Sequence, residues 1–152
     1  MNSVFKKLQY KDQDRIYIQG APAEFEPALD EMRELTEVST ISSGKRPVGF
    51  AMFFVKNCAE IAKTAPKAVA RVEDDGLLWF AYPKKSSKRY SSDIGRDDSW
   101  LVLGDLGFEA VRQIAIDDDW SALRFRRVEH IKTLKRDPKR AMTEKGKKRT
   151  RR

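Results

Sequence analysis

The chain has 152 residues, which is enough for one domain with a substantial core and short for two. Its positive charge is concentrated at one end: residues 131–152 carry 11 Lys or Arg against 2 Asp or Glu, whereas residues 1–130 carry 20 against 21. A charge-balanced body has no excess field that would attract phosphate over a long distance, which removes the simplest argument for a nucleic-acid-binding domain there. We expect a single α/β domain over residues 1–131 and a disordered basic tail over residues 132–152.

Cysteine content and hydropathy limit the cellular compartments in which the protein is expected. The one cysteine, Cys58, excludes an internal disulfide, and the chain has no Cys/His spacing suited to zinc. The opening segment MNSVFKKLQYKDQDR lacks the continuous apolar stretch of a signal peptide, and no apolar run approaches the roughly 20 residues that span a bilayer. We expect a cytoplasmic protein with no membrane partner.

The first half of the chain alternates predicted strands and a helix. RIYIQGA at 15–21 is β-branched and aromatic and runs into a Gly-Ala-Pro turn, which predicts a strand. Apolar residues at helical spacing predict a helix from Phe25 to Leu35. Residues 37–41 are predicted as a short edge strand. The segment VGFAMFFV at 48–55 is apolar on both faces, as a central strand covered by helices requires.

A second helix and a second buried strand follow. Asn57 lies three residues before Glu60, so its side chain is predicted to cap a helix while the glutamate bonds back to the cap. Pro66 predicts a kink or break in this helix, which we expect to end at residues 74–76. LLWFAY at 77–82 is then predicted as the second strongly buried strand.

The last predicted elements are a helix and a hairpin. Apolar residues at a spacing of three predict a helix from Trp100 that ends at Gly107. Residues 111–116 and 120–128 are predicted as two strands of a hairpin. A register that pairs Ile116 with Ser121 keeps the apolar residues on one face.

This order of elements predicts an α/β fold. We expect a three-layer, Rossmann-like sandwich with a mostly parallel sheet of five to six strands and a C-terminal antiparallel hairpin. Ligands of such sheets bind outside the carboxyl ends of the strands. The loops expected to meet there are residues 20–22, residues 56–57 and residues 83–89.

The segment WFAYPKKSSKR at 79–89 passes directly from a buried strand into cations and hydroxyls. A phosphate needs several convergent donors, and this loop is rich in them. The predicted ligand-binding residues are Tyr82, Lys84, Lys85, Ser86, Ser87, Lys88 and Asn57. The glycines of a GxxxxGK[ST] loop are absent, so no nucleotide triphosphatase is indicated. The alternative is a solvated loop in which Tyr82 and Pro83 pack at the end of the strand.

A second candidate surface lies on the last predicted strand. Trp120, Arg124 and Arg126 share one face by the two-residue period of a strand, and an aromatic ring beside two guanidinium groups can bind a nucleotide. The alternative is that these arginines pair with carboxylates on a covering helix.

Three further features carry weaker functional hypotheses. Carboxylates at 117–119 suit magnesium, but a hairpin turn explains them better, and we predict no metal site. His130 has no carboxylate at an evident spacing, so nothing supports a catalytic role. Cys58 lies at the predicted start of a helix without a histidine partner, and a core cysteine explains it better.

Two segments carry a resemblance to a family. YPKKSSK at 82–88 and WSALRFR at 120–126 resemble a small bacterial α/β domain family catalogued as a domain of unknown function, over about residues 15–131. This resemblance implies a fold and no activity, cofactor or catalytic residue.

A more distant resemblance concerns the fold. A central strand, a helix, the segment RVEDDGLLWFAYP, a helix and a closing hairpin are similar to the second half of Rossmann-like S-adenosylmethionine-dependent methyltransferases. The resemblance implies a glycine-rich cofactor turn after the first strand. That turn is IYIQGAPAEF here, with one glycine, and this departure argues against S-adenosylmethionine as the cofactor.

The function favoured by the sequence is a non-enzymatic binding domain for an anionic, phosphate-bearing ligand or partner. One alternative is a reduced methyltransferase-like or other transferase enzyme. Another is an RNA-associated accessory protein whose tail binds nucleic acid nonspecifically. The identity of the ligand and the oligomeric state are left open.

Overall fold

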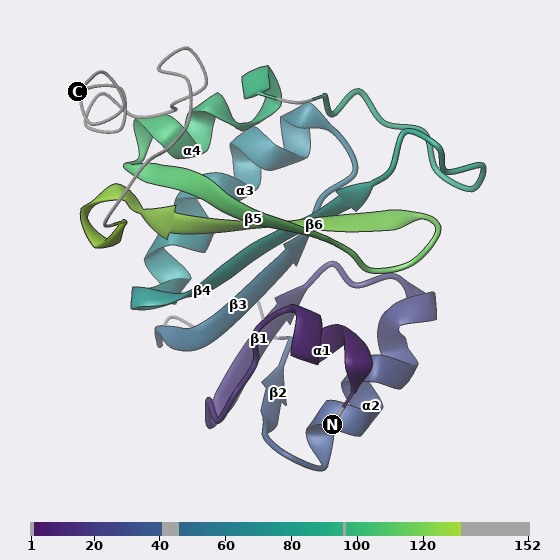
Figure 1. Ribbon diagram of the computed structural model, residues 1–152, viewed down its shortest axis with the longest axis vertical. Coiled ribbons are helices and arrows are strands. Elements are labelled where there is room, and N and C mark those ends of the chain that lie inside the picture. The colour runs from purple at the N-terminus through teal and green to yellow at the C-terminus, as the bar shows by residue number, and fades with distance from the viewer. Residues whose placement is uncertain (1, 41–45, 96, 132–152) are drawn as a thin grey trace.

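A computed structural model describes residues 2–40, 46–95 and 97–131 of the chain (Figure 1). The expected basic tail, residues 132–152, lies outside the described residues. None of the helices in the described part is long and apolar enough to cross a membrane.

Helices and strands alternate until a final pair of strands. In chain order the elements are α1 (Ser3–Lys7), β1 (Arg15–Gln19), the 3-10 turn η1 (Ala23–Phe25), α2 (Glu26–Arg33), β2 (Glu37–Ser39), β3 (Val48–Phe54), α3 (Cys58–Arg71), β4 (Val72–Pro83), η2 (Asp97–Trp100), α4 (Leu101–Asp105), β5 (Phe108–Ala115), β6 (Trp120–Arg127) and η3 (Val128–His130). The six strands form one sheet in the order β2-β1-β3-β4-β6-β5. The first four run parallel, and β6 is antiparallel to both of its neighbours. This is the predicted Rossmann-like α/β fold with its antiparallel hairpin.

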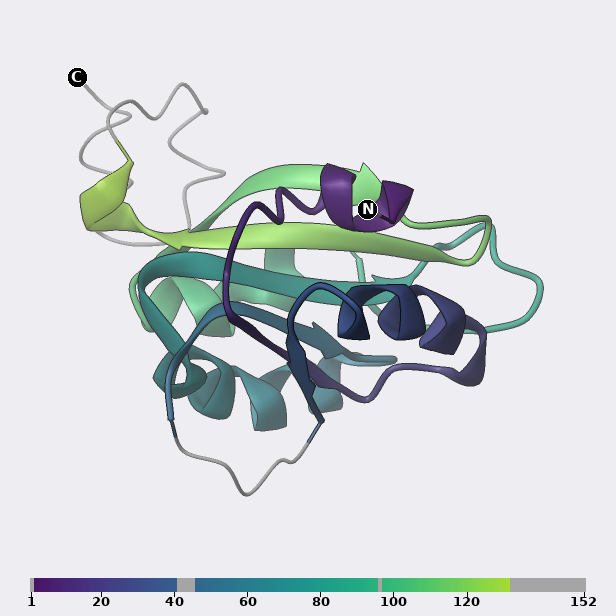
Figure 2. The same cartoon turned by 90° about the horizontal axis from the view of Figure 1, so that it is seen from below.

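The sheet separates two apolar cores, with helices on both of its sides (Figures 1 and 2). On one face α3 and α4 pack through buried residues such as Ile61 and Leu103. On the other face α1 and α2 pack through Phe5, Leu29 and Met32. The result is the three-layer sandwich, because each face of a sheet of this kind needs a helical layer to bury it.

Strand β3 is central, as its continuous apolar run predicts. It pairs with β1 on one side and with β4 on the other, and all of its residues except Gly49 are buried. Helix α1, which was not predicted, is tied to this core because Trp79 Nε1 donates a hydrogen bond to the carbonyl oxygen of Leu8 at 3.0 Å. That bond satisfies the one polar group of a completely buried indole.

Helix α3 differs from its prediction at two points. It runs without a break through Pro66, which lies on the exposed side of the helix, where the carbonyl that loses its partner can bond to water. The helix also ends at Arg71, earlier than predicted, because β4 begins at Val72 and includes residues 74–76. Asp75 there adopts a left-handed φ of 57°, and the β3–β4 register shifts nearby.

The register of the hairpin is one residue away from the predicted one. Ser121 lies opposite Ala115, so the predicted pairing of Ile116 with Ser121 is wrong. Ile116 instead belongs to the turn, where its N–H donates to the carbonyl oxygen of Trp120 at 2.9 Å. The Asp117 carboxylate accepts hydrogen bonds from the backbone N–H groups of Asp119 and Trp120, which stabilises the turn.

Candidate ligand site at the carboxyl edge of the sheet

Four connecting segments meet at the carboxyl edge of the parallel strands. They are the turn after β1, residues 55–57 after β3, the loop of residues 84–95 after β4, and the β5–β6 turn. The turn after β1 lies against the end of β3: a Cβ atom built on Gly20 would lie 3.0 Å from the carbonyl oxygen of Phe54. Gly20 has a φ of +75°, so only glycine fits this turn without strain.

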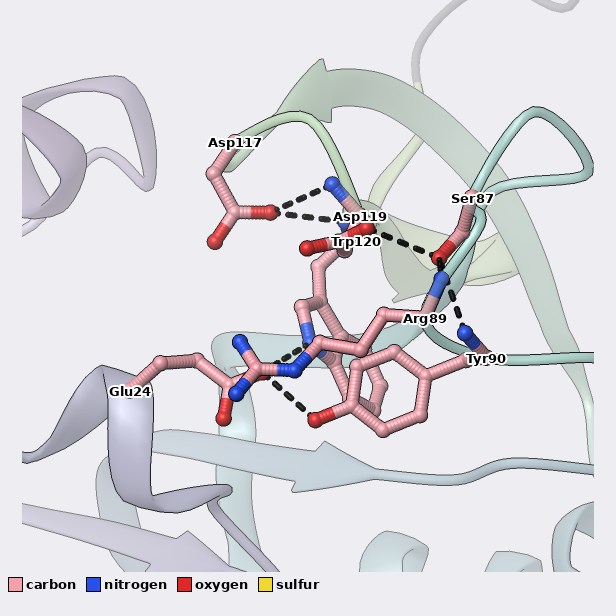
Figure 3. A network of polar contacts seen from close by, with 7 residues as sticks. All are labelled: Glu24, Ser87, Arg89, Tyr90, Asp117, Asp119 and Trp120. Atoms are coloured by element: carbon pink, nitrogen blue, oxygen red, sulfur yellow. Dashed lines mark hydrogen bonds and ion pairs between the residues drawn. The ribbon is translucent and has the colours of Figure 1, made fainter.

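Glu24 organises a polar network over this edge (Figure 3). Its Oε2 accepts a hydrogen bond from the Tyr90 hydroxyl at 2.5 Å and another from Trp120 Nε1 at 3.3 Å. The Arg89 guanidinium lies 3.6 Å from the same oxygen. The hydrogen bond from Tyr90 is the main reason that the pKa of Glu24 is lowered, and the same bond raises the pKa of Tyr90. The pair is therefore a carboxylate and a protonated phenol at neutral pH.

The loop after β4 is attached to the β5–β6 turn through Ser87 and Asp119 (Figure 3). The Ser87 hydroxyl donates to Asp119 Oδ1 at 2.8 Å and accepts from the backbone N–H groups of Arg89 and Tyr90. The Lys84 N–H donates to the Asp119 carbonyl oxygen at 2.8 Å. The Ser87 hydroxyl thus holds the loop in place, and it does not stand open to solvent as a phosphate donor.

An open, shallow depression of about 550 Å³ adjoins this edge at the start of α3. It is lined by Lys56, Asn57, Glu60, Ser91, Ser92 and Asp93. The predicted cap is present, since Asn57 Oδ1 accepts from the Glu60 N–H at 2.9 Å. The glutamate bonds back one residue further than predicted: Glu60 Oε1 accepts from the Lys56 N–H at 2.9 Å and not from the N–H of Asn57. Asp93 adds a third contact by accepting from the Cys58 N–H at 2.8 Å, which fixes the far end of the loop to the helix.

The predicted ligand-binding residues are divided among these features. Asn57 lines the depression, and Lys84, Lys85, Ser86, Ser87 and Lys88 form the first part of the loop. Tyr82 belongs elsewhere: its ring packs 5.3 Å from that of Trp100 in the core under α3 and α4. Gln113 Nε2 donates to its hydroxyl at 2.7 Å, and burial raises the pKa of Tyr82.

The second candidate surface is spread along β6. Trp120 lies at the carboxyl edge, opposite Pro83, whereas Arg126 lies six residues further on and forms two hydrogen bonds with Asp75, at 2.6 and 2.9 Å. Arg124 donates to Gln9 at 2.9 Å, and its pKa is lowered mainly by burial. The arginines therefore have protein partners, although the carboxylate is on β4 and not on a covering helix.

The weaker candidates have structural partners as well. Asp117 and Asp119 both bond within the loop network, and the described residues contain no cluster of acidic, His or Cys side chains that could hold a metal. His130 Nε2 lies 3.0 Å from Asp74, a partner 56 residues away that sequence spacing could not reveal, and this bond raises the pKa of His130. Cys58 is half-buried against the α3–α4 core.

Glu24, Tyr90 and Asp93 hold the site together through long-range contacts, and none of them was predicted as a site residue. Glu24 looked like an acidic residue at the start of a helix, and the other two looked like loop residues. Glu24 contacts Tyr90 across 66 residues, and Asp93 contacts Cys58 across 35. No local pattern encodes such pairings, so only the fold brings them together.

Comparison with known proteins supports the fold and does not assign a family. No family model and no curated protein matches the chain. The resemblance of YPKKSSK and WSALRFR to a bacterial domain family therefore stays a prediction.

Solved structures do match. N-methyltransferase NodS from Bradyrhizobium japonicum WM9 matches with a TM-score of 0.51 and 12% identity over 82% of this chain and 92% of that one. A S-adenosylmethionine-dependent methyltransferase from Aquifex aeolicus matches with a TM-score of 0.51 and 13% identity over 80% and 86%. A ribosomal protein L11 methylase from Lactobacillus delbrueckii subsp. bulgaricus matches with a TM-score of 0.50 and 10% identity over 82% and 74%. At these identities the likeness defines the class of fold: a Rossmann-like, methyltransferase-type α/β domain.

This comparison corrects the expectation about the cofactor. The sequence argued against S-adenosylmethionine, yet NodS, which shares the fold, was also solved with S-adenosylhomocysteine bound, with a TM-score of 0.51 to this chain. Because this chain shares its fold with NodS, the count of glycines is not an argument against S-adenosylmethionine. The expectation failed because it counted glycines, whereas the turn after β1 needs glycine only where its backbone meets Phe54.

Proposed function

We propose that this chain is a methyltransferase-like domain that binds S-adenosylmethionine at the carboxyl edge of β1, β3 and β4. The observation that carries the proposal is the fold shared with S-adenosylmethionine-dependent methyltransferases over at least 80% of this chain. This cofactor brings a reactive methyl group of its own, so the domain has to bind it, orient it and exclude water. The binding domain favoured by the sequence is thereby replaced by its methyltransferase-like alternative.

The turn after β1 supports this proposal. Ligands of doubly wound sheets bind where the backbone can approach them closely, at the carboxyl ends of the central strands. Gly20 gives the chain such a turn, because its left-handed φ and its contact with Phe54 exclude a side chain. The backbone at Gly20 therefore lies close to the end of β3, and residues 56–57, which follow β3, line the depression.

The chemistry of the depression also fits the cofactor. S-adenosylmethionine presents an ammonium group, two ribose hydroxyls, a sulfonium and a carboxylate. The lining offers acceptors for the donors, namely the carboxylates of Glu60 and Asp93, and one ammonium group, that of Lys56, for the carboxylate. Asp93 is already oriented by its bond from the Cys58 N–H, so little entropy is lost when it binds.

A narrower part of the proposal concerns anionic partners. Among the described residues, Lys84, Lys85 and Lys88 take part in no ion pair, so their ammonium groups are available to a phosphate. These lysines lie on the loop after β4, whose later residues Ser91, Ser92 and Asp93 line the depression. We assign them to a phosphate-bearing substrate or partner and not to the cofactor.

Thermal unfolding with added ligand tests the proposal. A ligand at about 100 times its dissociation constant stabilises the native state by about 2.7 kcal/mol, which raises the melting temperature of a domain of this size by about 5–10 °C. We expect S-adenosylmethionine and S-adenosylhomocysteine to produce this rise. Inorganic phosphate, titrated in parallel and followed by NMR, is expected to shift amide signals of residues 84–88 only.

An isosteric substitution localises the site. Asp93→Asn replaces a charged acceptor by a neutral amide, and we expect cofactor affinity to fall by about tenfold, as the loss of one charge-assisted hydrogen bond implies. Asp105→Asn is the matched control, because Asp105 is an exposed carboxylate at the end of α4, outside the depression. No stabilisation by either cofactor form at millimolar concentration would overturn the proposal.

A further inference from the structure

Tyr90 occupies a slot that the rest of the domain builds. Its ring lies 5.0 Å from the Trp120 ring, and its hydroxyl donates to Glu24 at 2.5 Å (Figure 3). The Lys56 ammonium lies over the Tyr90 ring, 5.6 Å from its centre. One planar ring with one hydrogen-bond donor thus fills a space bounded by an indole, a carboxylate and a cation.

The walls of this slot do not depend on Tyr90. Glu24 belongs to η1, and Trp120 begins β6, with only 1% of its surface exposed. Trp120 also packs against Phe54 at 5.2 Å and donates its indole N–H to Glu24. The carboxylate and the indole are therefore held in place by the body of the domain when the Tyr90 side chain leaves.

Tyr90 can leave without unfolding the loop. On its N-terminal side the loop is held by the bonds between Ser87 and Asp119, and on its C-terminal side by the bond between Asp93 and Cys58. The Tyr90 backbone N–H is itself held by the Ser87 hydroxyl at 3.0 Å. Rotation of one partly exposed side chain about its own Cα–Cβ bond therefore empties the slot.

An empty slot would expose the face of Trp120 and remove one donor from Glu24. A ligand ring that resembles the Tyr90 side chain can restore both contacts. It would cover the apolar face of the indole and donate an N–H or O–H hydrogen bond to the carboxylate. A positively charged ring is disfavoured by Lys56, and an anionic one by Glu24. The occupant with matching chemistry is a neutral planar ring that carries a hydrogen-bond donor.

We infer that Tyr90 is a built-in occupant of a ring-binding slot, which exchanges it for a ligand's planar ring bearing an N–H or O–H donor. Nucleobases with an amino group and phenols share this chemistry. Lys56 lines both the slot and the depression, so the two sites adjoin. That the bound ring is the methyl acceptor rests on the proposed function, whereas the slot itself does not.

The test uses the full chain and the NMR signal of the Trp120 indole N–H, assigned by its loss in Trp120→Phe. The probes are adenosine and cytidine as amino nucleobases, 4-methylphenol as the phenol, and N6,N6-dimethyladenosine as a ring that has lost its amino donor. We expect adenosine, cytidine or the phenol to shift the Trp120 signal and dimethyladenosine to bind at least fivefold more weakly than adenosine. Which of the three binds most tightly identifies the source of the ring.

Substitutions of Tyr90 test whether its side chain competes with a ligand ring for the slot or has only a structural role. An occupant competes with the ligand, so its removal raises the fraction of open slot and lowers the apparent dissociation constant by the same factor. We expect Tyr90→Ala to bind the preferred ring about five- to tenfold more tightly than the wild type, and Tyr90→Phe, which keeps the ring and loses the donor, about twofold more tightly. Glu24→Gln should weaken binding about tenfold. Leu35→Ala, at an exposed position away from the slot, should leave it unchanged.

The outcomes distinguish this inference from the proposed function. If Tyr90→Ala and Tyr90→Phe bind every ring no more tightly than the wild type, Tyr90 is structural and the inference is overturned. S-adenosylmethionine is titrated on the same samples. If the cofactor binds but the Tyr90 substitutions do not change ring binding, the proposed function is supported and the inference about Tyr90 is not. If the Tyr90 variants bind a ring more tightly and no sample binds S-adenosylmethionine, the ring-binding slot is supported and the proposed function is overturned. Should Tyr90→Ala fail to fold, Tyr90→Phe and Glu24→Gln decide.

Discussion

At the scale of single residues, the structure of the carboxyl edge depends mainly on Gly20, which has no side chain, and on Glu24, whose carboxylate has several partners. Gly20 lets the turn after β1 meet β3, and Glu24, four residues later, bonds to both the loop after β4 and the first residue of β6. Each of these residues joins parts of the chain that are far apart in sequence. Substitutions here should therefore alter the edge as a whole and not one contact.

Gly20 allows the first prediction. Gly20→Ala adds a Cβ atom at a φ of +75° and 3.0 Å from a backbone oxygen, so it meets both backbone strain and a steric clash. We expect it to lower the free energy of unfolding by about 2–3 kcal/mol, measured by urea denaturation.

Gly107 provides the matched control. Its φ is +89°, but nothing lies within 4 Å of a Cβ built there. Gly107→Ala should therefore cost only the backbone strain, about 1 kcal/mol. Equal losses for the two variants would show that the contact between Gly20 and Phe54 contributes nothing.

At the scale of elements, the start of α3 is the best-defined part of the site. Three side chains satisfy backbone N–H groups there: Asn57 at the N-cap, Glu60 in the first turn and Asp93 from the loop. The Asn57–Glu60 pair was predictable, because capping is a local pattern at fixed spacing. The Asp93 contact was not, because loop residues carry no periodic signal.

Asn57 gives the prediction at this scale. Asn57→Ala removes the acceptor of the Glu60 N–H and should lower the free energy of unfolding by about 1 kcal/mol, measured as a shift in the urea midpoint at unchanged slope. Asn57→Asp keeps an oxygen at the same place and should retain most of the stability. A loss of stability as large for Asp as for Ala would mean that the side chain acts by some means other than capping.

Predictions of other elements failed where local signals conflicted with tertiary ones. Residues 74–76 resemble a turn, yet they lie inside β4, at the point where the register with β3 shifts and Arg126 bonds to Asp75. Ile116 resembles a strand residue, yet it lies in the turn, where its N–H donates to the carbonyl oxygen of Trp120. Local strand propensity and hydrophobic pattern determine a residue's structure less strongly than packing against a neighbouring strand does. For this reason the register of the strands and the boundaries of the elements were the least predictable features.

At the scale of the whole molecule, charge and fold are separated along the chain. Residues 1–130 are nearly neutral, and residues 131–152 carry most of the excess positive charge. The structure describes a methyltransferase-type α/β body and does not describe residues 132–152. Any nonspecific affinity for nucleic acid is therefore expected to come from those residues.

A truncation tests this division. The chain ending at Ile131 should lose binding to a single-stranded RNA of mixed sequence and keep its melting temperature. Binding by the full chain should weaken about tenfold or more between 50 and 200 mM salt, as release of counterions from several phosphates requires. Retention of RNA binding by the truncated chain, in a gel-shift assay, would place the RNA contact on the body.

The sequence by itself determined the class of fold, the central strand, the capped start of α3 and the edge of the sheet at which a ligand is expected. All of these depend on periodicity and on residue types at short spacing, which act within one or two elements. Only the tertiary structure decided which residues form the site: Ser87 became a loop anchor, Tyr82 a core residue, and Glu24 the centre of a network with Tyr90 and Trp120. The reason is physical, since a hydrogen bond or ring contact between residues far apart in the sequence exists only after the backbone has folded.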